Sequence, residues 1–148
     1  MIEKGIDGKM WRVVKNLYKK VSSCVRLGEE KTEWFSLDVG LRQGCILSPV
    51  LFSIFIDGLA AEVKKIGGAK YGELVLSLLL FADDIVLVAE SEKQMQEMLD
   101  VVYKYSQKNR FKFNKDKCKI MIFGKKAKNK KFRLGGSELE VVHSYKNI

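Results

Sequence analysis

The sequence predicts an α+β fold. Two patterns of apolar residues and the amino-acid composition indicate it. Three segments carry the apolar spacing of helices, and shorter segments between them resemble strands, without the strict order of a βαβ protein. Of the 148 residues, 47% are hydrophobic and 30% are charged, and only one is proline. A chain of this composition can form a core, which excludes disordered, collagen-like and mucin-like proteins.

The first expected elements are a helix and a hairpin. Apolar residues from Met10 to Val21 follow the i, i+3, i+4, i+7 spacing of an amphipathic helix, which we expect to begin after Asp7 as N-cap. Residues 21–27 and 32–39 predict two strands joined by a turn at 28–31. Residues 40–44 then form a loop.

The second helix is predicted to run from Ser48 to about Lys65. A serine hydroxyl is a good cap, and Pro49 loses nothing at the first helical position, where its missing N–H has no partner. The segment is apolar on nearly every side, so we expect a central, buried helix that ends at Gly67 and Gly68.

Two apolar segments follow and flank a pair of acids. Residues 74–81 and 85–89 are continuously apolar, which is typical of strands buried on both faces. Asp83 and Asp84 are therefore expected at the tip of a buried hairpin.

The last third predicts one helix and three strands. Ser91 and Gln94 form a capping box for a helix to about Lys108. Residues 119–123, 131–134 and 139–143 indicate strands, the last two joined by a turn at 135–136.

Basic residues are concentrated in one part of the chain. Residues 104–133 hold 13 Lys and Arg against one acid, a local net charge of +12, whereas the rest of the chain carries −3. This favours a polyanionic partner, because cations that neutralise phosphates release condensed counterions. A solvated loop or a localisation signal explains the same run, and phenylalanines 111, 113 and 123 either stack on bases or pack inward. The candidates for nucleic-acid backbone contact are Lys125, Lys126, Lys130 and Lys131.

Three cysteines and a single histidine exclude two further classes of protein. An odd number of cysteines without a C-x-x-C pair gives neither a disulfide framework nor a zinc site, which fits a cytoplasmic or nuclear protein. The longest apolar stretch is far shorter than the roughly 20 residues that span a bilayer, so we expect no membrane partner.

Asp83 and Asp84 are the strongest candidates for chemistry. Adjacent carboxylates at the end of apolar strands repel each other and are costly to desolvate, and a bound cation relieves both penalties. Oxygen ligands of this kind suit Mg²⁺ or Mn²⁺, and only a turn lets both carboxylates approach one metal. Ordinary turn chemistry without any ligand is the alternative.

Three motifs in order carry a resemblance to a known family. Residues 41–52 resemble the reverse transcriptase segment that contacts the template and the incoming nucleotide, and residues 81–84 resemble the polymerase aspartate motif in its F-A-D-D form. Asn114 and Lys117 match the N-x-x-K segment. The sequence is most similar to enzymes of non-LTR (LINE-like) retrotransposons, and the likeness extends over essentially all of the chain.

The resemblance implies the palm of a right-hand polymerase, with an antiparallel sheet, packed helices and a catalytic Asp-Asp hairpin. It implies RNA-directed DNA synthesis by nucleotidyl transfer, with two Mg²⁺ or Mn²⁺ ions in the complete enzyme. Asp83 would be the principal metal ligand and Asp84 a supporting one. The implied partners are an RNA template, a DNA primer and deoxynucleoside triphosphates.

The remaining site residues also follow from the resemblance. Arg42, Gln43 and Gly44 would line the pocket for the templating base and the incoming nucleotide, with Gly44 allowing close backbone approach. Phe81 would pack beneath the acids and border this pocket. Lys117 would lie near the leaving phosphates as a contact or proton donor, although a solvated lysine in a basic run explains it equally.

One expected motif is missing from the sequence. The family requires a further aspartate on a strand before the first helix, and Asp7, Asp38 and Asp57 do not follow an apolar strand there. Residues 1–148 are thus predicted to be a partial, palm-centred reverse transcriptase domain, without that motif and without the thumb, and inactive alone. A non-catalytic nucleic-acid-binding remnant of a decayed retroelement, or a product without function, are the alternatives.

Overall fold

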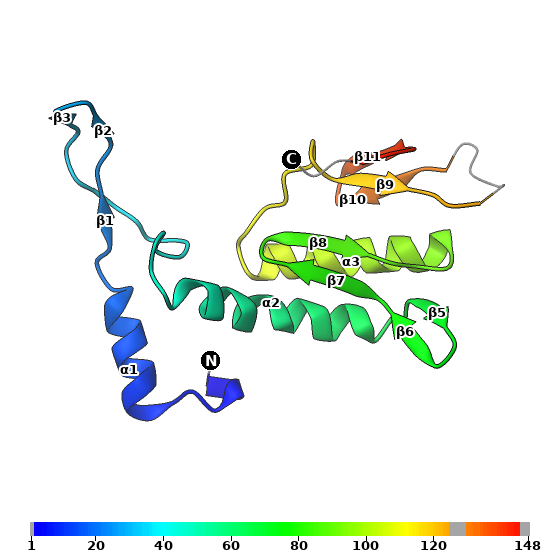
Figure 1. Ribbon diagram of the computed structural model, residues 1–148, viewed down its shortest axis with the longest axis horizontal. Helices are drawn as coiled ribbons and strands as arrows, with labels where there is room; N and C mark the ends of the chain where they lie inside the picture. Colours follow the sequence, from blue (N-terminus) through cyan, green and yellow to red (C-terminus); the bar gives the residue numbers. More distant parts are fainter. Residues whose placement is uncertain (1, 125–129, 146–148) are drawn as a thin grey trace. The chain divides into compact units, whose positions relative to one another are not determined.

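A computed structural model describes residues 2–124 and 130–145 (Figure 1). The chain divides into two compact units, Met1–Phe55 and Ile56–Ile148. The boundary falls inside helix α2 (Ser48–Lys64), so each unit holds one end of that helix.

The first unit begins with a short 3₁₀ helix (Ile2–Lys4) and helix α1 (Gly8–Leu17). Asp7 precedes α1 as predicted, but its side chain makes no capping hydrogen bond. Val14 is buried, whereas Met10 on the same apolar stripe stays 62% exposed. The apolar face of α1 is thus covered at Val14 alone among the residues described for this helix. The sheets described in this unit have two strands each, and such small sheets cover little surface.

The predicted hairpin is confirmed, although it is shorter at every strand. Strand β1 (Ser22–Ser23) pairs with β4 (Phe35–Ser36), and β2 (Arg26–Leu27) pairs with β3 (Glu30–Lys31). The turn holds two residues rather than the predicted four, since Leu27 already pairs with Glu30.

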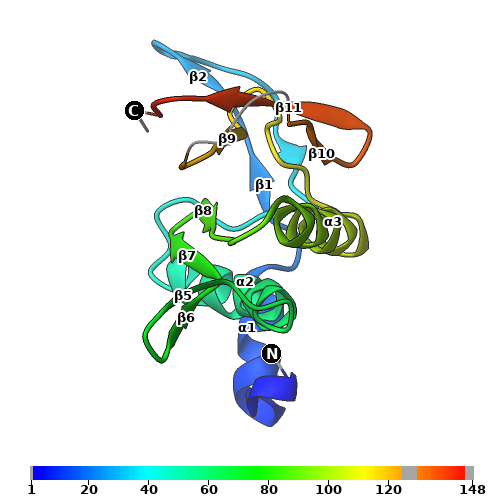
Figure 2. The same ribbon diagram turned by 90° about the vertical axis from the view of Figure 1, so that its right-hand side faces the viewer.

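Helix α2 occupies the predicted segment, but the expectation that it is buried all round is wrong. In the first unit Val50 is 56% exposed, and full burial begins in the second unit. The buried residues of α2 are Ile56, Leu59, Ala60 and Val63. Burial needs a packing partner, and within the second unit α3 supplies one for this half of the helix, as Figure 2 shows.

Gly68 marks the predicted end of this helical segment for a steric reason. A Cβ atom at this position would lie 2.1 Å from the carbonyl oxygen of Leu76. Any side chain would therefore push apart two stretches of backbone that here lie in contact.

Two hairpins follow where the sequence predicts one. Strand β5 (Ala69–Tyr71), which the sequence analysis missed, pairs with β6 (Leu74–Leu76), and β7 (Leu78–Phe81) pairs with β8 (Asp84–Leu87). The break falls at buried Ser77, whose carbonyl oxygen accepts a 2.9 Å hydrogen bond from the backbone N–H of Val88.

The β7–β8 hairpin is buried on one face, not on both as predicted. Leu79 and Val86 are directly opposed and are 52% and 53% exposed, whereas Leu78 and Leu87 on the other face are partly buried. Within the described residues of this unit, a helix layer of α2 and α3 lies beside the hairpin on one side only (Figures 1 and 2). Because the helices cover one face of the β7–β8 hairpin, its other face is exposed to water.

Helix α3 (Glu92–Lys108) begins with half of the predicted capping box. The Ser91 hydroxyl accepts a 3.2 Å hydrogen bond from the Gln94 backbone N–H, as expected. The Gln94 side chain, however, accepts from the N–H of Glu90, one residue earlier than in a regular box. The buried residues of this helix are Met98, Leu99, Val102 and Ser106.

The last three strands form a sheet in the order β10-β11-β9. Strand β10 (Phe132–Leu134) pairs antiparallel with β11 (Ser137–Val142) around Gly135, and β11 pairs parallel with β9 (Lys119–Met121). The expected antiparallel pairing is thus found between β10 and β11 and in the four two-stranded sheets, whereas β9 and β11 are parallel. The described strands form five small sheets, and β10 lies in the crossover that a parallel pair such as β9 and β11 needs.

Side-chain contacts fix this sheet on α3. The Gln96 side chain donates to the carbonyl oxygen of Arg133 and accepts from its N–H, at 2.9 and 3.0 Å, as a neighbouring strand would. Figure 2 shows α3 between the sheet and the C-terminal half of α2. The α+β class is thus confirmed, and no helix of the described ranges has the length and apolar character to cross a membrane.

The difference in burial between Val63 and Val50 on α2 predicts that the same Val→Ala substitution changes stability by different amounts at the two positions. Val63→Ala removes fully buried methyl groups and should lower the free energy of unfolding by about 2 kcal/mol, from lost transfer energy and the cavity left behind. Val50→Ala, on the exposed half of the same helix, should change it by less than about 0.5 kcal/mol. Urea denaturation followed by circular dichroism measures both, and equal losses would contradict the packing described here.

Candidate functional site

The F-A-D-D residues form the connection of the β7–β8 hairpin. Phe81 pairs with Asp84, so Ala82 and Asp83 make a two-residue turn. Ala82 has φ +49°, whereas Asp83 has a negative φ. A positive φ at the first turn position alone is the pattern of a type II′ hairpin turn, which glycine adopts without strain and alanine does not.

The two carboxylates therefore lie where the sequence places them, in a turn, but not in a buried one. Asp83 lies within the turn and Asp84 begins β8, and both residues are exposed. The turn frees Asp83 from the strict alternation of strand side chains, so both carboxylates can approach one cation.

Their oxygen atoms are the ligand type that Mg²⁺ and Mn²⁺ prefer, and the pair fits such an ion as a partial donor set. Within residues 2–124 and 130–145, no group of three or more Asp, Glu, His or Cys residues gathers. Further oxygen ligands would thus come from phosphates, from water or from another protein segment.

Phe81 is 81% exposed, which corrects the expectation that it packs beneath the acids. Strand alternation places it on the open face of the hairpin, together with Leu79, Val86 and Asp84. The aromatic ring and the Asp84 carboxylate thus share one solvent-facing surface.

Arg42, Gln43 and Gly44 form an exposed loop in the first unit. The Ser48 hydroxyl donates a 2.7 Å hydrogen bond to the carbonyl oxygen of Arg42, and the Tyr18 hydroxyl lies 3.0 Å from the same Ser48 oxygen. Ser48 is the first residue of α2 and not its predicted N-cap. Its hydroxyl instead fixes the backbone of the loop.

Gly44 has φ +76°, and a Cβ atom there would meet no described atom within 4 Å. The glycine is therefore explained by its left-handed backbone rather than by the close backbone approach that we expected within the chain. At the next residue, a hydrogen bond from the backbone of Leu47 lowers the pKa of the Cys45 thiol.

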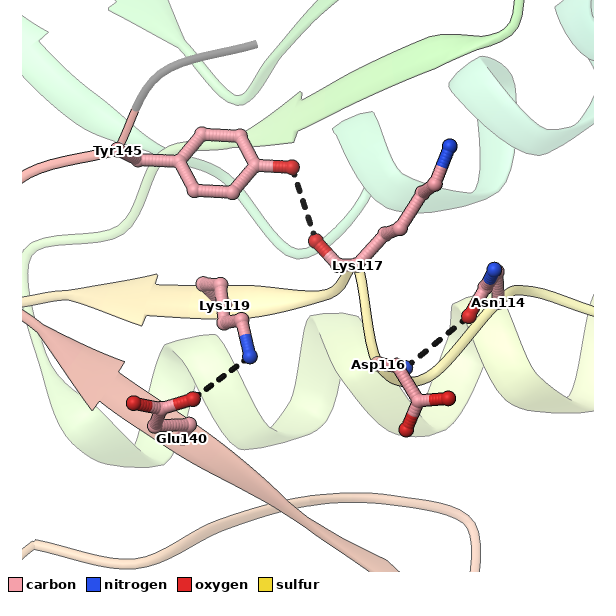
Figure 3. A network of polar contacts seen from close by, with 6 residues as sticks. All are labelled: Asn114, Asp116, Lys117, Lys119, Glu140 and Tyr145. Atoms are coloured by element: carbon pink, nitrogen blue, oxygen red, sulfur yellow. Dashed lines mark hydrogen bonds and ion pairs between the residues drawn. The ribbon is translucent and has the colours of Figure 1, made fainter. Parts of the chain in front are cut away.

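The N-x-x-K segment is a compact turn (Figure 3). The Asn114 side-chain oxygen accepts a hydrogen bond from the Asp116 N–H at 3.1 Å. The Asn114 backbone carbonyl oxygen accepts another from the Lys117 N–H, also at 3.1 Å. This is the turn chemistry for which asparagine is favoured. The Lys117 side chain is exposed, and Figure 3 shows its amine pointing away from the surrounding contacts.

Contacts from the C-terminal residues hold this turn and the strand that follows it. The Tyr145 hydroxyl donates a 2.9 Å hydrogen bond to the carbonyl oxygen of Lys117. Lys119 on β9 pairs with Glu140 on β11 at 2.6 Å, and this hydrogen bond raises the pKa of Lys119. Burial raises the pKa of the intervening Cys118 thiol.

Several lysines of the basic segment already face carboxylates. Lys130 pairs with Glu92, and Lys131 lies 3.2 Å from Glu138. Lys125 and Lys126 lie outside the described residues. In the aromatic part of the segment, Phe111 and Phe113 pack edge to face at 5.2 Å and are partly buried, whereas Phe123 is 86% exposed.

Three residues whose hydroxyl groups contact the Arg42 loop or the N-x-x-K turn were not predicted from the sequence. They are Tyr18, Ser48 as a loop anchor, and Tyr145. The hydroxyl contacts of the tyrosines span 30 and 28 residues, so no local pattern signals them.

The sequence matches the family described as Reverse transcriptase (RNA-dependent DNA polymerase) over residues 5–139. The chain belongs to the reverse transcriptase family. The resemblance drawn from the three motifs is thereby confirmed, and the match includes the Arg42 loop, the β7–β8 turn and the N-x-x-K turn.

Similar proteins come from non-LTR retrotransposons. The chain is 33% identical over 105 residues to the Retrovirus-related Pol polyprotein from type-2 retrotransposable element R2DM of Drosophila melanogaster, covering 71% of this chain. It is 27% identical over 118 residues to the R2 polyprotein of Nasonia vitripennis, covering 80%. It is 27% identical over 150 aligned positions to the RNA-directed DNA polymerase from mobile element jockey of Drosophila funebris, covering 97%. The matched parts are 10%, 12% and 16% of those proteins' lengths.

The positive φ of Ala82 in the β7–β8 turn predicts how a substitution at this residue changes stability. Ala82→Gly should raise the free energy of unfolding by about 1 kcal/mol, because glycine adopts a positive φ without the steric cost that alanine meets. Thermal denaturation measures the change.

Ala61→Gly is the matched control, since Ala61 is exposed in the interior of α2. There the same exchange should lower stability by about 1 kcal/mol. A loss of stability at both positions would show that the turn does not hold Ala82 in the left-handed region.

Proposed function

We propose that the chain supplies part of the palm of a non-LTR retrotransposon RNA-directed DNA polymerase, with Asp83 and Asp84 as its metal-binding carboxylates. The observation that carries this proposal is the pair of adjacent acids in the two-residue β7–β8 turn, inside the region that matches reverse transcriptases. Bound Mg²⁺ or Mn²⁺, two ions in the complete site, would supply charge neutralisation at the reacting phosphates.

The other motif residues take supporting roles in this proposal. Arg42, Gln43 and Gly44 contact the templating base and the incoming deoxynucleoside triphosphate, and the exposed Phe81 ring borders the nucleotide. Lys117 contacts the leaving phosphates or donates a proton to them. An RNA template and a DNA primer are the remaining partners.

We further propose that residues 1–148 act as a partial reverse transcriptase domain that does not polymerise alone. Two carboxylates hold one divalent ion incompletely, and a two-metal site needs oxygen ligands beyond those that gather among the described residues. In this proposal the further ligand of the complete enzyme is an aspartate outside residues 1–148, and the thumb likewise lies outside them.

The first test is Mn²⁺ binding to the isotope-labelled chain, followed by paramagnetic broadening of backbone amide signals. We expect selective broadening around residues 81–86. Asp83→Asn should weaken Mn²⁺ binding about tenfold or more, because it removes one of two charged ligands.

Asp38→Asn is the matched control, because Asp38 is exposed and lies in the first unit. It should leave Mn²⁺ affinity unchanged. Equal effects of the two variants would contradict the metal site, and Mg²⁺-dependent primer extension by the unmodified chain, lost in Asp83→Ala, would contradict its inactivity alone.

A second function, non-catalytic nucleic-acid binding, is favoured by the charges of the basic segment. Lys104 and Lys108 share a face of α3, and Lys112 follows in the exposed connection. Within the part of the chain that the structure describes, none of the three has a carboxylate at ion-pair distance. They can bind phosphates without first breaking a pair, as Lys130 and Lys131 would have to.

RNA binding at several salt concentrations tests this function. Exchanging Lys104, Lys108 and Lys112 together for Gln should lower the slope of log affinity against log salt by about 2, since each phosphate contact of a single strand contributes roughly 0.7.

The control exchanges three exposed lysines outside the basic segment for Gln, namely Lys31, Lys65 and Lys93, with the same loss of net charge. It should leave the slope nearly unchanged. RNA binding that does not depend on salt, or equal slopes in both triple variants, would contradict a contact at this segment.

A further inference from the structure

Tyr145 makes a contact that the motifs of the sequence do not explain. Its hydroxyl donates to the carbonyl oxygen of Lys117 at 2.9 Å, across 28 residues of sequence (Figure 3). Tyr145 also lies beyond residues 5–139, the part that matches the reverse transcriptase family.

The hydrogen bond adds little to the sheet itself. Strands β9 and β11 are already joined by their parallel register from Lys119 to Met121 and by the Lys119–Glu140 ion pair. Tyr145 is 47% exposed, so about half of its surface is removed from water, and Tyr145→Phe retains that packing. What the bond constrains is the turn before β9.

The backbone on both sides of the Lys117 side chain is held. The Lys117 N–H donates to Asn114 within the turn, and the Lys117 carbonyl accepts from Tyr145 outside it. The side chain leaves from the Cα atom between these two groups. Fixing both therefore fixes the direction of the Cα–Cβ bond, and with it the region that the flexible side chain and its exposed amine can reach.

The Arg42 loop has the same arrangement. There the Ser48 hydroxyl donates to the carbonyl oxygen of a residue whose cationic side chain is exposed. In both motifs a hydroxyl from another segment holds the backbone, and the charged side chain is exposed, although the Arg42 guanidinium also donates a 3.5 Å hydrogen bond to the carbonyl oxygen of Leu17.

We propose that Tyr145 is a positioning residue, which aims the Lys117 amine at the phosphates of a bound nucleoside triphosphate. This inference rests on the role of Lys117 in the proposed function. Tyr145 itself touches no phosphate, and acts through the backbone of the N-x-x-K turn.

The first measurement is hydrogen exchange of the turn in Tyr145→Phe, which removes the hydroxyl and keeps the ring. The amides of Lys117 and Cys118 should exchange about two- to tenfold faster, which corresponds to the loss of one exposed hydrogen bond. Tyr71→Phe is the matched control, because Tyr71 is 85% exposed and lies on β5. It should leave this exchange unchanged.

The second measurement is acetylation of individual lysines with and without dATP and Mg²⁺, read by mass spectrometry. Nucleotide should protect Lys117 in the unmodified chain and in Tyr71→Phe. In Tyr145→Phe, half-protection of Lys117 should require about two- to tenfold more dATP. Reactivity at Lys70, an exposed lysine on β5, provides the internal reference.

The outcomes separate three cases. Faster exchange together with weaker protection in Tyr145→Phe supports the proposal. Faster exchange with unchanged protection overturns it, since Tyr145 is then only structural, and unchanged exchange overturns it because the bond does not hold the turn. Absence of protection in the unmodified chain also overturns it, and Mn²⁺ binding at Asp83 then shows whether the proposed function as a whole has failed.

Discussion

In residues 56–148, apolar side chains from α2, α3 and the three-stranded sheet share one core, and this burial is the constraint on which the other features of the unit depend. Leu59, Val63 and Met98 are fully buried there. Removal of such surfaces from water is the dominant favourable term in folding. The β7–β8 hairpin and the N-x-x-K turn contribute few of these buried residues. They are positioned by the core rather than part of it, so their side chains can be exposed without loss of the scaffold.

Sequence periodicity predicted the elements that make this core, and failed where tertiary cover decides the outcome. The helices at 8–17, 48–64 and 92–108 and the hairpins at 22–36, 78–87 and 132–142 follow from local spacing and turn residues, whereas the β5–β6 hairpin was missed. Burial of Val50 and Leu79 did not follow, because an apolar side chain is buried only if another element lies against it. The parallel β9–β11 pair was missed for a related reason, since strand direction depends on how the intervening residues cross.

In the candidate site, too, some features follow from local sequence and others depend on tertiary contacts. Its motif residues could be named from sequence, because the acids, the glycine and the asparagine each carry a local conformational or chemical signal. The hydroxyl groups that hold the backbones of Arg42 and Lys117 could not, since serine and tyrosine have many roles and the tyrosine partners are distant in sequence. Exposure of Phe81 was also unpredictable, because its strand is apolar on both faces and only one face is covered.

The order of strands in the β10-β11-β9 sheet has a consequence for the sequence of folding events. The β10–β11 hairpin closes through a tight turn at Gly135, and such hairpins form in about 1–10 μs. Among the described strands, β9 pairs with β11 alone, and each of its residues meets a partner 21 positions further along the chain, as Lys119 meets Glu140. This longer-range pairing is expected to form after the hairpin. The turn that carries Lys117 directly precedes β9 and becomes ordered with it. We therefore expect this turn to be among the last parts of the unit to form and among the first to open.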